Sequence, residues 1–248
     1  MKKQKMVEAM DARIGVVTPD DAINDDELWE YLPERTNLLV TRYRTLKRFE
    51  PISSAMVDSY ADTQIVQEAA ETLRITRPSS VLFSCNSCSF VRGPGADFQI
   101  IEHIQRGAGA PATTITTAQV EALRHLEAQR VAVGGPYPQE LTDHLGNFLT
   151  ASGFEVTSVV GLGMESEWEI GNADAQVWAN LAQRVDRREA DRVILACSGI
   201  RTSSILDALE RKLGKPVISA PAVGVWHALR LAGIQTRLKG RGYLLAHH

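Results

Sequence analysis

The sequence has few cysteines, few aromatic residues, no long apolar run and no large excess of charge. Three cysteines among 248 residues are an odd count, which argues against a disulfide framework and favours free thiols in a reducing compartment. No stretch reaches the roughly 18 apolar residues that a membrane-spanning helix needs. A net charge of -3 gives no electrostatic reason to expect nucleic acid or an anionic membrane as a partner. These absences predict a cytoplasmic protein that binds neither nucleic acid nor membrane.

Two basic segments carry no targeting or nucleic-acid motif. Residues 1–10 are basic but lead into no apolar stretch, so they predict neither a signal peptide nor an anchor. The densest basic cluster contains one aromatic residue, Tyr43, and no known nucleic-acid module, so it is interpreted as a solvated strand end or loop. Its members are Arg42, Arg44, Lys47 and Arg48.

Eight short runs rich in β-branched residues are predicted to be strands. They are residues 13–17, 38–43, 81–85, 113–117, 131–134, 156–160, 193–197 and 217–220. Most are separated by segments with helical spacing of apolar residues, such as Ile65, Val66, Ala69 and Leu73. Near-continuous apolar strands that alternate with amphipathic helices predict an α/β fold, with parallel sheets covered by helices.

Two of the predicted strands end in similar segments that contain a cysteine. These are "SSVLFSCNS" with Cys85 and "DRVILACSG" with Cys197. Ligand sites of open α/β sheets gather at the carboxyl ends of their strands. Two similar halves that each offer a cysteine at the same place predict a cleft between two lobes with a thiol on either wall.

The residues that follow each cysteine suit the binding of a small anion. They are Asn86 and Ser87 in the first segment and Ser198 and Gly199 in the second, and they allow backbone N–H groups to converge. A strand-to-helix turn also lowers the pKa of a thiol, because a helix N-terminus favours negative charge. Both thiols are therefore expected to form thiolates near neutral pH. The alternative is that the two cysteines are merely packed in the core, where free cysteine is common.

Other candidate sites carry weaker signals. Cys85 and Cys88 form a CxxC, but no second pair completes a structural metal site and no thioredoxin-like context surrounds it, so Cys88 is expected to be a packed residue and no metal is expected. Tyr137 follows another predicted strand, where its hydroxyl could donate to an anionic ligand or lie at the rim. Asn172 is either a ligand amide or a helix N-cap.

Several segments together resemble a known enzyme group. They are "SCNSCSFVRG", "TTITTAQVEALRHLEAQRVAVGGPY", "ACSGIRT" and "LERKLGKPVISAPAVGVWHALRLAG". The chain resembles the aspartate/glutamate racemase superfamily, in the branch of the maleate cis-trans isomerases and arylmalonate decarboxylases. In the decarboxylases glycine replaces the first cysteine, whereas racemases and maleate isomerases of the superfamily keep both, as this chain does with Cys85 and Cys197.

The resemblance implies a fold, an assembly and a substrate class. It implies two pseudo-symmetric α/β lobes, residues 1–116 with 221–248 and residues 117–220, with the active site in the cleft between them. It also implies a homodimer or higher homo-oligomer that acts on a small carboxylic acid and uses neither a metal nor an organic cofactor.

The resemblance also assigns roles to residues. Cys85 and Cys197 would be the catalytic thiols, and Asn86, Ser87, Ser198 and Gly199 would donate to a substrate carboxylate. Tyr137 would hydrogen-bond that carboxylate and Asn172 would help to hold a diacid. After the first strand, maleate isomerases usually show Pro-Ser-Ser-Asn, whereas this chain has Asp20 and Asp21 in the run Pro19 to Ala22. Two acids beside the site would repel a dicarboxylate. Either they point away from the site, or the substrate carries a positive group or fewer negative charges.

The expected activity is a cofactor-independent cis-trans isomerisation of the maleate isomerase kind, by thiolate addition, bond rotation and elimination. The first alternative is racemisation of an amino acid such as aspartate or glutamate, or of a hydantoin, by the same two thiols. An arylmalonate-type decarboxylase comes third, because a bulky Cys85 would crowd the aryl group. A small-acid binding protein without turnover is the non-enzymatic alternative.

Overall fold

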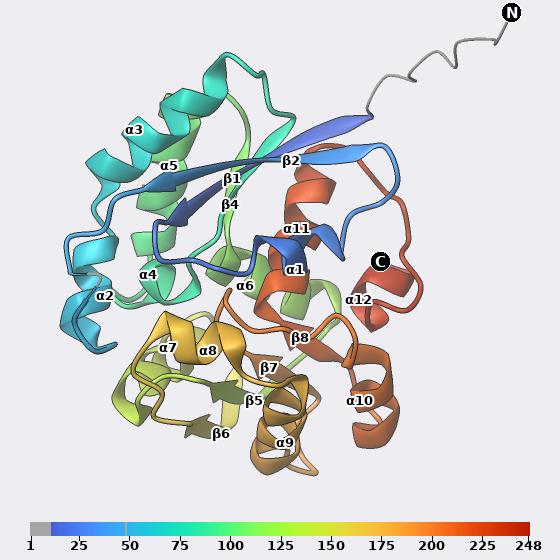
Figure 1. The fold of residues 1–248 in the computed structure, drawn as a ribbon. Coiled ribbons are helices and arrows are strands. Elements are labelled where there is room, and N and C mark those ends of the chain that lie inside the picture. Colours follow the sequence, from blue (N-terminus) through green and yellow to red (C-terminus); the bar gives the residue numbers. More distant parts are fainter. Residues whose placement is uncertain (1–10, 48) are drawn as a thin grey trace, which may run out of the picture.

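Eight parallel strands form two separate sheets of four strands each (Figure 1). The structure is a computed structural model that describes residues 11–47 and 49–248. The first sheet has the order β2-β1-β3-β4 and the second the order β6-β5-β7-β8. The two sheets thus repeat one topology, with the first strand of each half lying between the second and the third. The predictions made for residues 1–10 and for Arg48 lie outside the described residues.

All eight predicted strands are confirmed, although several end earlier than expected. The strands are β1 (Ala12–Pro19), β2 (Thr36–Tyr43), β3 (Ser80–Phe83), β4 (Ala112–Thr114), β5 (Arg130–Gly135), β6 (Glu155–Gly161), β7 (Arg192–Leu195) and β8 (Val217–Ser219). The predicted strand 113–117 is wrong in its second half. There the Thr114 hydroxyl accepts the backbone N–H of Thr117 at 3.0 Å and caps a helix that starts at Ile115.

Twelve helices connect and cover the strands within the described ranges. In the first half they are α1 (Asp25–Trp29), α2 (Ser54–Tyr60), α3 (Thr63–Arg74), α4 (Asn86–Phe90), α5 (Ala96–Ala108) and α6 (Ile115–His125). In the second half they are α7 (Gln139–Ala151), α8 (Glu167–Asn172), α9 (Ala175–Val185), α10 (Leu206–Leu213), α11 (Ala220–Leu231) and α12 (Tyr243–His247). Over this part of the chain no helix has both the length and the apolar character to cross a membrane.

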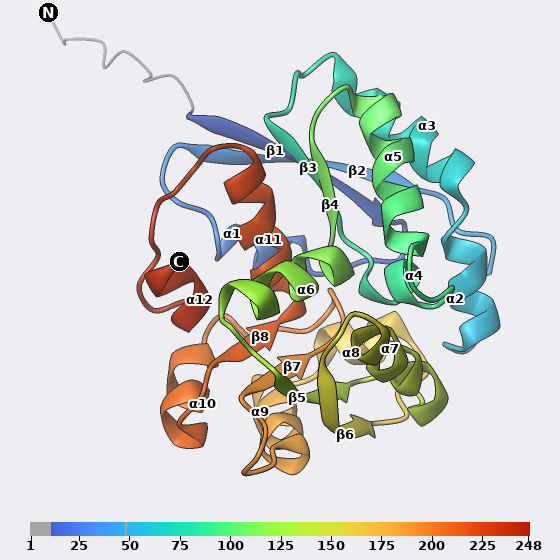
Figure 2. The same ribbon diagram turned by 180° about the vertical axis from the view of Figure 1, so that it is seen from behind.

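The helices lie on both faces of each sheet, as the continuous apolar strands predict. Helices α3 and α5 pack against each other and against the first sheet, while α11 returns from late in the chain to pack beside α6 on β3 and β4 (Figure 2). Helices α7 and α9 pack on the second sheet. Every residue of β3 is buried, because this strand is covered on both sides. The lobe bounds expected above, with α11 assigned to the first lobe, stay a prediction.

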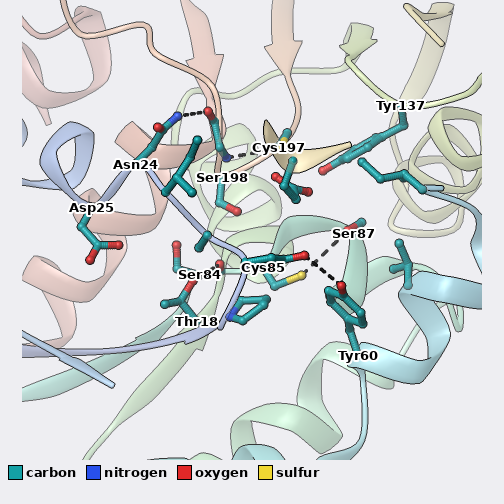
Figure 3. A pocket seen from close by; sticks show the side chains of 18 of the residues that line it. Thr18, Asn24, Asp25, Tyr60, Ser84, Cys85, Ser87, Tyr137, Cys197 and Ser198 are labelled. Atoms are coloured by element: carbon teal, nitrogen blue, oxygen red, sulfur yellow. Dashed lines mark hydrogen bonds between the residues drawn. The ribbon is translucent and has the colours of Figure 1, made fainter. Parts of the chain in front are cut away.

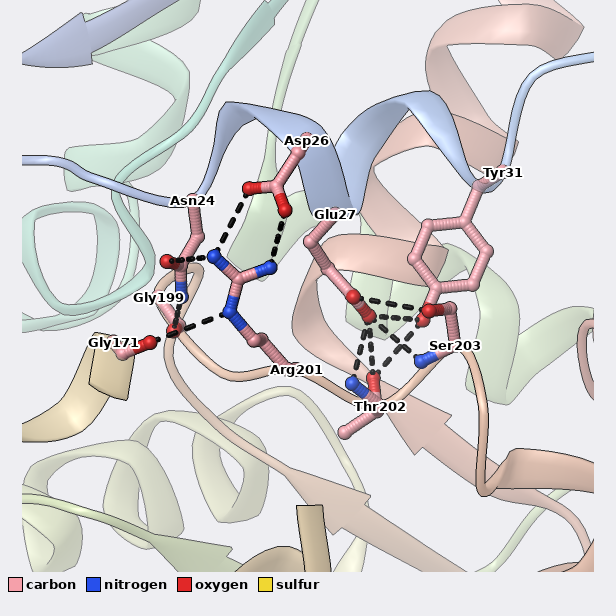
Figure 4. A network of polar contacts seen from close by, with 9 residues as sticks. All are labelled: Asn24, Asp26, Glu27, Tyr31, Gly171, Gly199, Arg201, Thr202 and Ser203. Carbon is pink, nitrogen blue, oxygen red and sulfur yellow. Dashed lines mark hydrogen bonds and ion pairs between the residues drawn. The ribbon is translucent and has the colours of Figure 1, made fainter. Parts of the chain in front are cut away.

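The loop that follows β7 is bound to α1 through a buried carboxylate (Figure 4). Glu27 accepts the backbone N–H groups of Thr202 and Ser203, each at 2.7 Å, and the hydroxyl of Tyr31 at 2.8 Å. Glu27 is 3% exposed, so its charge is balanced by these donors rather than by water. The network joins a segment between β1 and β2 to a segment more than 170 residues later.

Figure 4 shows a second set of contacts between the α1 region and the loop that follows β7, at the part of the loop closest to that strand. Arg201 forms an ion pair with Asp26 and donates to the side-chain oxygen of Asn24 at 2.9 Å. The amide nitrogen of Asn24 in turn donates to the carbonyl oxygen of Gly199. Together the two sets hold residues 199–203 against the first half of the chain.

Candidate functional site

A cavity lies where the carboxyl ends of the two sheets face each other, and both predicted cysteines line it (Figure 3). Cys85 follows β3 of the first sheet and Cys197 follows β7 of the second. Figure 3 shows the two side chains entering the same space from opposite sides. Cysteine side chains 112 positions apart in the sequence therefore line one cavity. Both cysteines are also buried, as the packing alternative expects, but they line one shared cavity.

Cys85 is bonded to Cys88 in this structure, which corrects the expectation that all thiols are free. Cys85 is the N-cap residue of α4 and Cys88 lies within that helix, with the two Cα atoms 5.6 Å apart. Cys88 is fully buried, as expected for a packed residue. The Cys85 sulfur also lies 3.8 Å from the Ser87 hydroxyl. Thiolate chemistry at Cys85 therefore requires the reduced form of this pair.

Cys197 has an unusual backbone conformation for a residue with a side chain. Its φ angle is 85°, in the left-handed region that favours glycine, which costs on the order of 1–3 kcal/mol. The Cys197 N–H donates to the side-chain oxygen of Asn86 at 3.0 Å, and the Gly199 N–H donates to the Cys197 sulfur at 3.3 Å. These bonds hold the sulfur toward the cavity against the local strain.

Cys197 is not a preformed thiolate, which corrects a second expectation. The next helix, α10, begins only at Leu206, so no helix N-terminus stabilises a negative charge on this sulfur. Burial, and then the charge of Glu167, raise the pKa of Cys197 well above its usual value. Hydrogen bonds from Tyr137 and from the Gly199 N–H act in the opposite direction but are weaker. We therefore expect the Cys197 thiol to stay protonated near neutral pH.

Of the four residues that follow the cysteines, three line the cavity and one does not. Ser87, Ser198 and Gly199 line the cavity, whereas Asn86 does not. The amide nitrogen of Asn86 donates to Thr116 and Gln119 of α6, at 3.0 and 3.2 Å, while its oxygen accepts the N–H of Cys197. Asn86, at the start of α4, thus ties the Cys197 turn to α6.

Tyr137 lies inside the cavity rather than at its rim. Only 1% of its surface is exposed, so the interpretation as a rim residue is wrong. Its hydroxyl interacts with the Cys197 thiol and with Ser87. Burial, followed by the charges of Cys197 and Glu167, raises the pKa of Tyr137 well above its usual value. The phenol is therefore a hydrogen-bond donor at any physiological pH.

Asn172 lies outside the residues that line the cavity. It is the last residue of α8, and its amide donates to the Trp168 carbonyl oxygen at 2.8 Å. It is not a helix N-cap either, because Asp174 caps α9 by accepting the N–H of Gln176. The role implied for Asn172 by the resemblance has no counterpart in this arrangement.

The two acids after β1 point in different directions. Asp20 accepts the backbone N–H and the hydroxyl of Thr45, at 3.1 and 2.7 Å, and does not line the cavity. Asp21 does line it and accepts the hydroxyl of Tyr60 at 2.8 Å. One of the two carboxylates therefore faces the site.

Sequence reasoning missed Glu167, the first residue of α8, which also lines the cavity. A methyl group placed on Gly199 would lie 3.0 Å from Glu167 Oε2 and 3.6 Å from the Cys197 sulfur, so the two groups flank the same point. Burial of the carboxyl, and then the charge of Asp21, raise the pKa of Glu167 to about 8. No local pattern in "GMESEWEIGN" distinguishes Glu167 from Glu165 or Glu169, because only the packing of α8 selects it.

The cavity combines groups that suit reactions at a small carboxylic acid. It offers two sulfurs on opposite walls, the hydroxyls of Ser87 and Tyr137, and the polar turn Ser198–Gly199. Buried hydroxyl donors stabilise negative charge that develops on a carboxylate. A protonated thiol beside them can give a proton to a carbanion and take it back.

Comparisons with known proteins agree with this geometry. A maleate isomerase of Nocardia farcinica is 26% identical over 243 residues, which cover 94% of this chain and 95% of that protein. An arylmalonate decarboxylase of Bordetella bronchiseptica is 31% identical over 149 residues, and the match spans 59% of this chain and 62% of that relative. A solved structure of the Nocardia farcinica maleate cis-trans isomerase has a TM-score of 0.83 at 25% identity and covers 96% of this chain and 99% of that chain.

That solved structure is a cysteine-to-serine variant with a covalently bound succinylcysteine intermediate. In addition, the family model described as arylmalonate decarboxylase matches residues 48–245, which is most of this sequence. The match includes both cysteine turns, Tyr137 and α8. The chain therefore belongs to the arylmalonate decarboxylase family.

Proposed function

We propose that this chain is a cofactor-independent isomerase that converts the cis double bond of a small carboxylic acid to the trans form. The observation that carries the proposal is the position of Cys85 and Cys197 on opposite walls of one cavity. The maleate isomerase relative, similar along nearly its whole length, supports the same chemistry.

Cys85 is the nucleophile in this proposal, once it is reduced. It lies at the start of α4 beside the Ser87 hydroxyl, whereas burial keeps Cys197 protonated. The Cys85 thiolate adds to the alkene carbon β to the carboxylate, and the π electron pair moves into that carboxylate as an enediolate. The Tyr137 and Ser87 hydroxyls stabilise the enediolate, and loss of one such donor costs about 3 kcal/mol in the transition state.

Cys197 moves the proton. The former double bond is now single, so it rotates while Cys197 gives a proton to the carbanionic carbon and later recovers it. Expulsion of the Cys85 thiolate then restores the double bond in the trans form. No atom is gained or lost overall. The succinylcysteine intermediate in a relative that lacks one cysteine supports an adduct formed by a single thiol.

The test is the turnover of cis-unsaturated acids, with maleate as the first, by reduced protein in D2O, followed by proton NMR. We expect Cys85→Ala and Cys197→Ala each to lower kcat by at least about a thousandfold, because each removes a group that acts in the transition state. Cys88→Ala is the matched control, since Cys88 does not line the cavity. Full activity in either of the first two variants would contradict the two-thiol mechanism.

The same spectra separate the isomerase from its alternatives. A racemase would incorporate deuterium at the α-carbon of aspartate, glutamate or a hydantoin, and a decarboxylase would release CO2 from phenylmalonate. A cytoplasmic location and a homodimer or higher homo-oligomer are further parts of the proposal. Light scattering on the purified chain measures the second of these.

A further inference from the structure

Two asparagine side chains from the first half of the chain hold the Cys197 turn, residues 197–199. The side-chain oxygen of Asn86 accepts the N–H of Cys197 at 3.0 Å. The amide nitrogen of Asn24 donates to the carbonyl oxygen of Gly199 (Figure 4). The turn is thus bonded at both of its ends, once through an N–H and once through a C=O. We call Asn24 and Asn86 the asparagine clamp.

Other bonds fix the orientation of the Asn86 amide. Asn86 is 1% exposed, and its amide nitrogen donates to the Thr116 hydroxyl at 3.0 Å and to the Gln119 side-chain oxygen at 3.2 Å. An amide nitrogen can only donate, so these two acceptors leave the amide oxygen to face the Cys197 N–H. The first member of the clamp is therefore held by α6 and in turn holds the backbone of Cys197.

Asn24 occupies the N-cap position of α1, but its side chain does not cap that helix. Asparagine is among the preferred N-cap residues because its oxygen usually accepts an N–H of the first helical turn. Here that oxygen instead accepts a hydrogen bond from Arg201 at 2.9 Å, and Arg201 is itself paired with Asp26. The amide nitrogen of Asn24 is thereby directed at Gly199, so this side chain serves the turn and not its own helix.

The Cys197 turn needs such support because of its backbone conformation. Cys197 has a φ angle of 85°, and a left-handed conformation of a residue with a side chain persists only where its surroundings hold it. The same conformation brings the Gly199 N–H to 3.3 Å from the Cys197 sulfur. A turn that relaxed to a negative φ would direct the sulfur elsewhere. The clamp therefore acts on the direction of the thiol.

We propose that Asn24 and Asn86 are positioning residues, which hold the Cys197 turn so that its thiol is aimed at the substrate carbon that it protonates. This inference rests on the proposed isomerase function and adds two residues to it. Asn86 acts without touching the substrate, since it does not line the cavity. Asn24 lines the cavity, but both ends of its amide are bonded to protein groups.

Loss of the clamp should stop the reaction at a defined step. The Cys85 thiolate still adds to the alkene, but Cys197 no longer delivers its proton to the carbanionic carbon. Water then supplies that proton and becomes hydroxide, and no positioned base removes the proton again. The bond between Cys85 and the substrate cannot break, so the adduct accumulates. A relative in which serine replaces a cysteine holds a succinylcysteine adduct.

The experiment measures steady-state kinetics of reduced protein with maleate, together with the mass of the denatured protein after turnover. We expect Asn86→Ala to lower kcat by about a hundredfold and to change KM by less than about threefold. We also expect an adduct on at least about half of the variant molecules, against less than about a tenth of the unchanged ones. Peptide mapping should place the adduct on Cys85.

Asn24→Asp tests the second member of the clamp and does not depend on the folding of Asn86→Ala. Aspartate keeps an oxygen for Arg201 but has no N–H for the Gly199 carbonyl. We expect kcat to fall by about tenfold with the same adduct. Asn172→Ala is the matched control, because Asn172 donates to the Trp168 carbonyl outside the cavity, and its kcat should stay within about twofold of the unchanged protein.

Three results would overturn the inference. An unchanged kcat would show that the turn does not need the clamp. A KM raised by more than about tenfold at constant kcat would mean that the asparagines bind the substrate. A low kcat without any adduct would indicate a general loss of structure.

If unchanged protein isomerises no cis acid, the proposed function fails instead, and amide hydrogen exchange measured by NMR then tests the clamp itself. In Asn24→Asp the Cys197 N–H should exchange at least about tenfold faster than in unchanged protein, while the N–H of Ile194 in β7 keeps its rate. Equal exchange of Cys197 in both proteins, or an equal acceleration at Ile194, would overturn the inference.

Discussion

The oxidation state of Cys85 should decide whether the protein is active, because Cys85 is bonded to Cys88 in this structure. The bond between them occupies the sulfur that the proposed mechanism uses as nucleophile. We expect protein isolated without reductant to turn over its substrate at least about a hundredfold more slowly than protein treated with a thiol reductant, because only a thiolate adds to the alkene. Progress curves before and after reduction measure this difference.

Cys88→Ser supplies the control for this prediction. The variant cannot form the bond, so its activity should be the same with and without reductant. Thiol titration under denaturing conditions counts the free cysteines in each preparation. Full activity in unchanged protein that shows only one free thiol, that of Cys197, would contradict the requirement for reduced Cys85.

Glu167 should make the stability of the protein depend on pH. Its pKa is raised to about 8 in the folded chain, whereas an unfolded glutamate titrates near its usual value of 4.5. The folded state therefore holds the proton more tightly, and the stabilisation is complete at low pH and is lost as the pH rises toward 8. Glu167 is only partly buried, so solvent reduces the effect of this pKa shift on stability. Between pH 5 and 8 we expect the free energy of unfolding of the unchanged protein to fall by about 2 kcal/mol relative to that of Glu167→Gln.

Urea titrations of both proteins at several pH values measure this loss. Glu169→Gln tests whether any first-turn carboxylate of α8 would act in the same way. A constant difference in unfolding free energy between Glu167→Gln and unchanged protein across this range would show that Glu167 titrates normally.

At the scale of elements, the packing of α5 on α3 depends on a glycine. A Cβ atom at Gly107 would lie 2.6 Å from the carbonyl oxygen of Gln67 and 3.0 Å from the Ala70 methyl. Alanine has the higher helix propensity by about 1 kcal/mol, but a rigid neighbouring backbone leaves no space for its methyl group. We expect Gly107→Ala to lower the free energy of unfolding by about 1–3 kcal/mol. Thermal unfolding measures this effect.

Gln105→Ala is the matched control on the same helix. Gln105 is exposed, so its substitution should change stability by less than about 0.5 kcal/mol. A stabilised Gly107→Ala protein would mean that α3 and α5 can move apart without cost.

At the scale of the whole molecule, Glu27 is a buried polar link between the early and late parts of the chain. Glu27→Ala leaves the N–H groups of Thr202 and Ser203 without their acceptor (Figure 4). Removal of a buried charged acceptor costs about 2–4 kcal/mol. The loop 199–203 should also become less ordered, which lowers kcat because Gly199 donates to the Cys197 sulfur.

Urea unfolding and kcat are measured together for this variant. Glu30→Ala is the control, since Glu30 is an exposed residue paired with Arg241, and such a pair contributes about 0–1 kcal/mol. A Glu27→Ala protein as stable as the Glu30→Ala protein would show that apolar packing alone holds the two parts together.

The sequence by itself determined the strands and the position of the two cysteines. Strands can be recognised from local patterns of apolar residues. Ligand sites of open α/β sheets commonly lie at the carboxyl ends of the strands. Cys85 and Cys197 could therefore be placed on facing walls without coordinates. The end of β4 was missed because the cap formed by Thr114 competes with the β-branched run 113–117.

Only the tertiary structure decided which other groups face the thiols and in what protonation state. Glu167 lines the cavity and Asn172 does not, although both belong to α8, because the packing of that short helix directs one end inward. The raised pKa of Cys197 arises from burial and from a carboxyl 30 positions earlier in the chain. Desolvation and charge depend on distances between folded segments, and no local sequence pattern contains those distances.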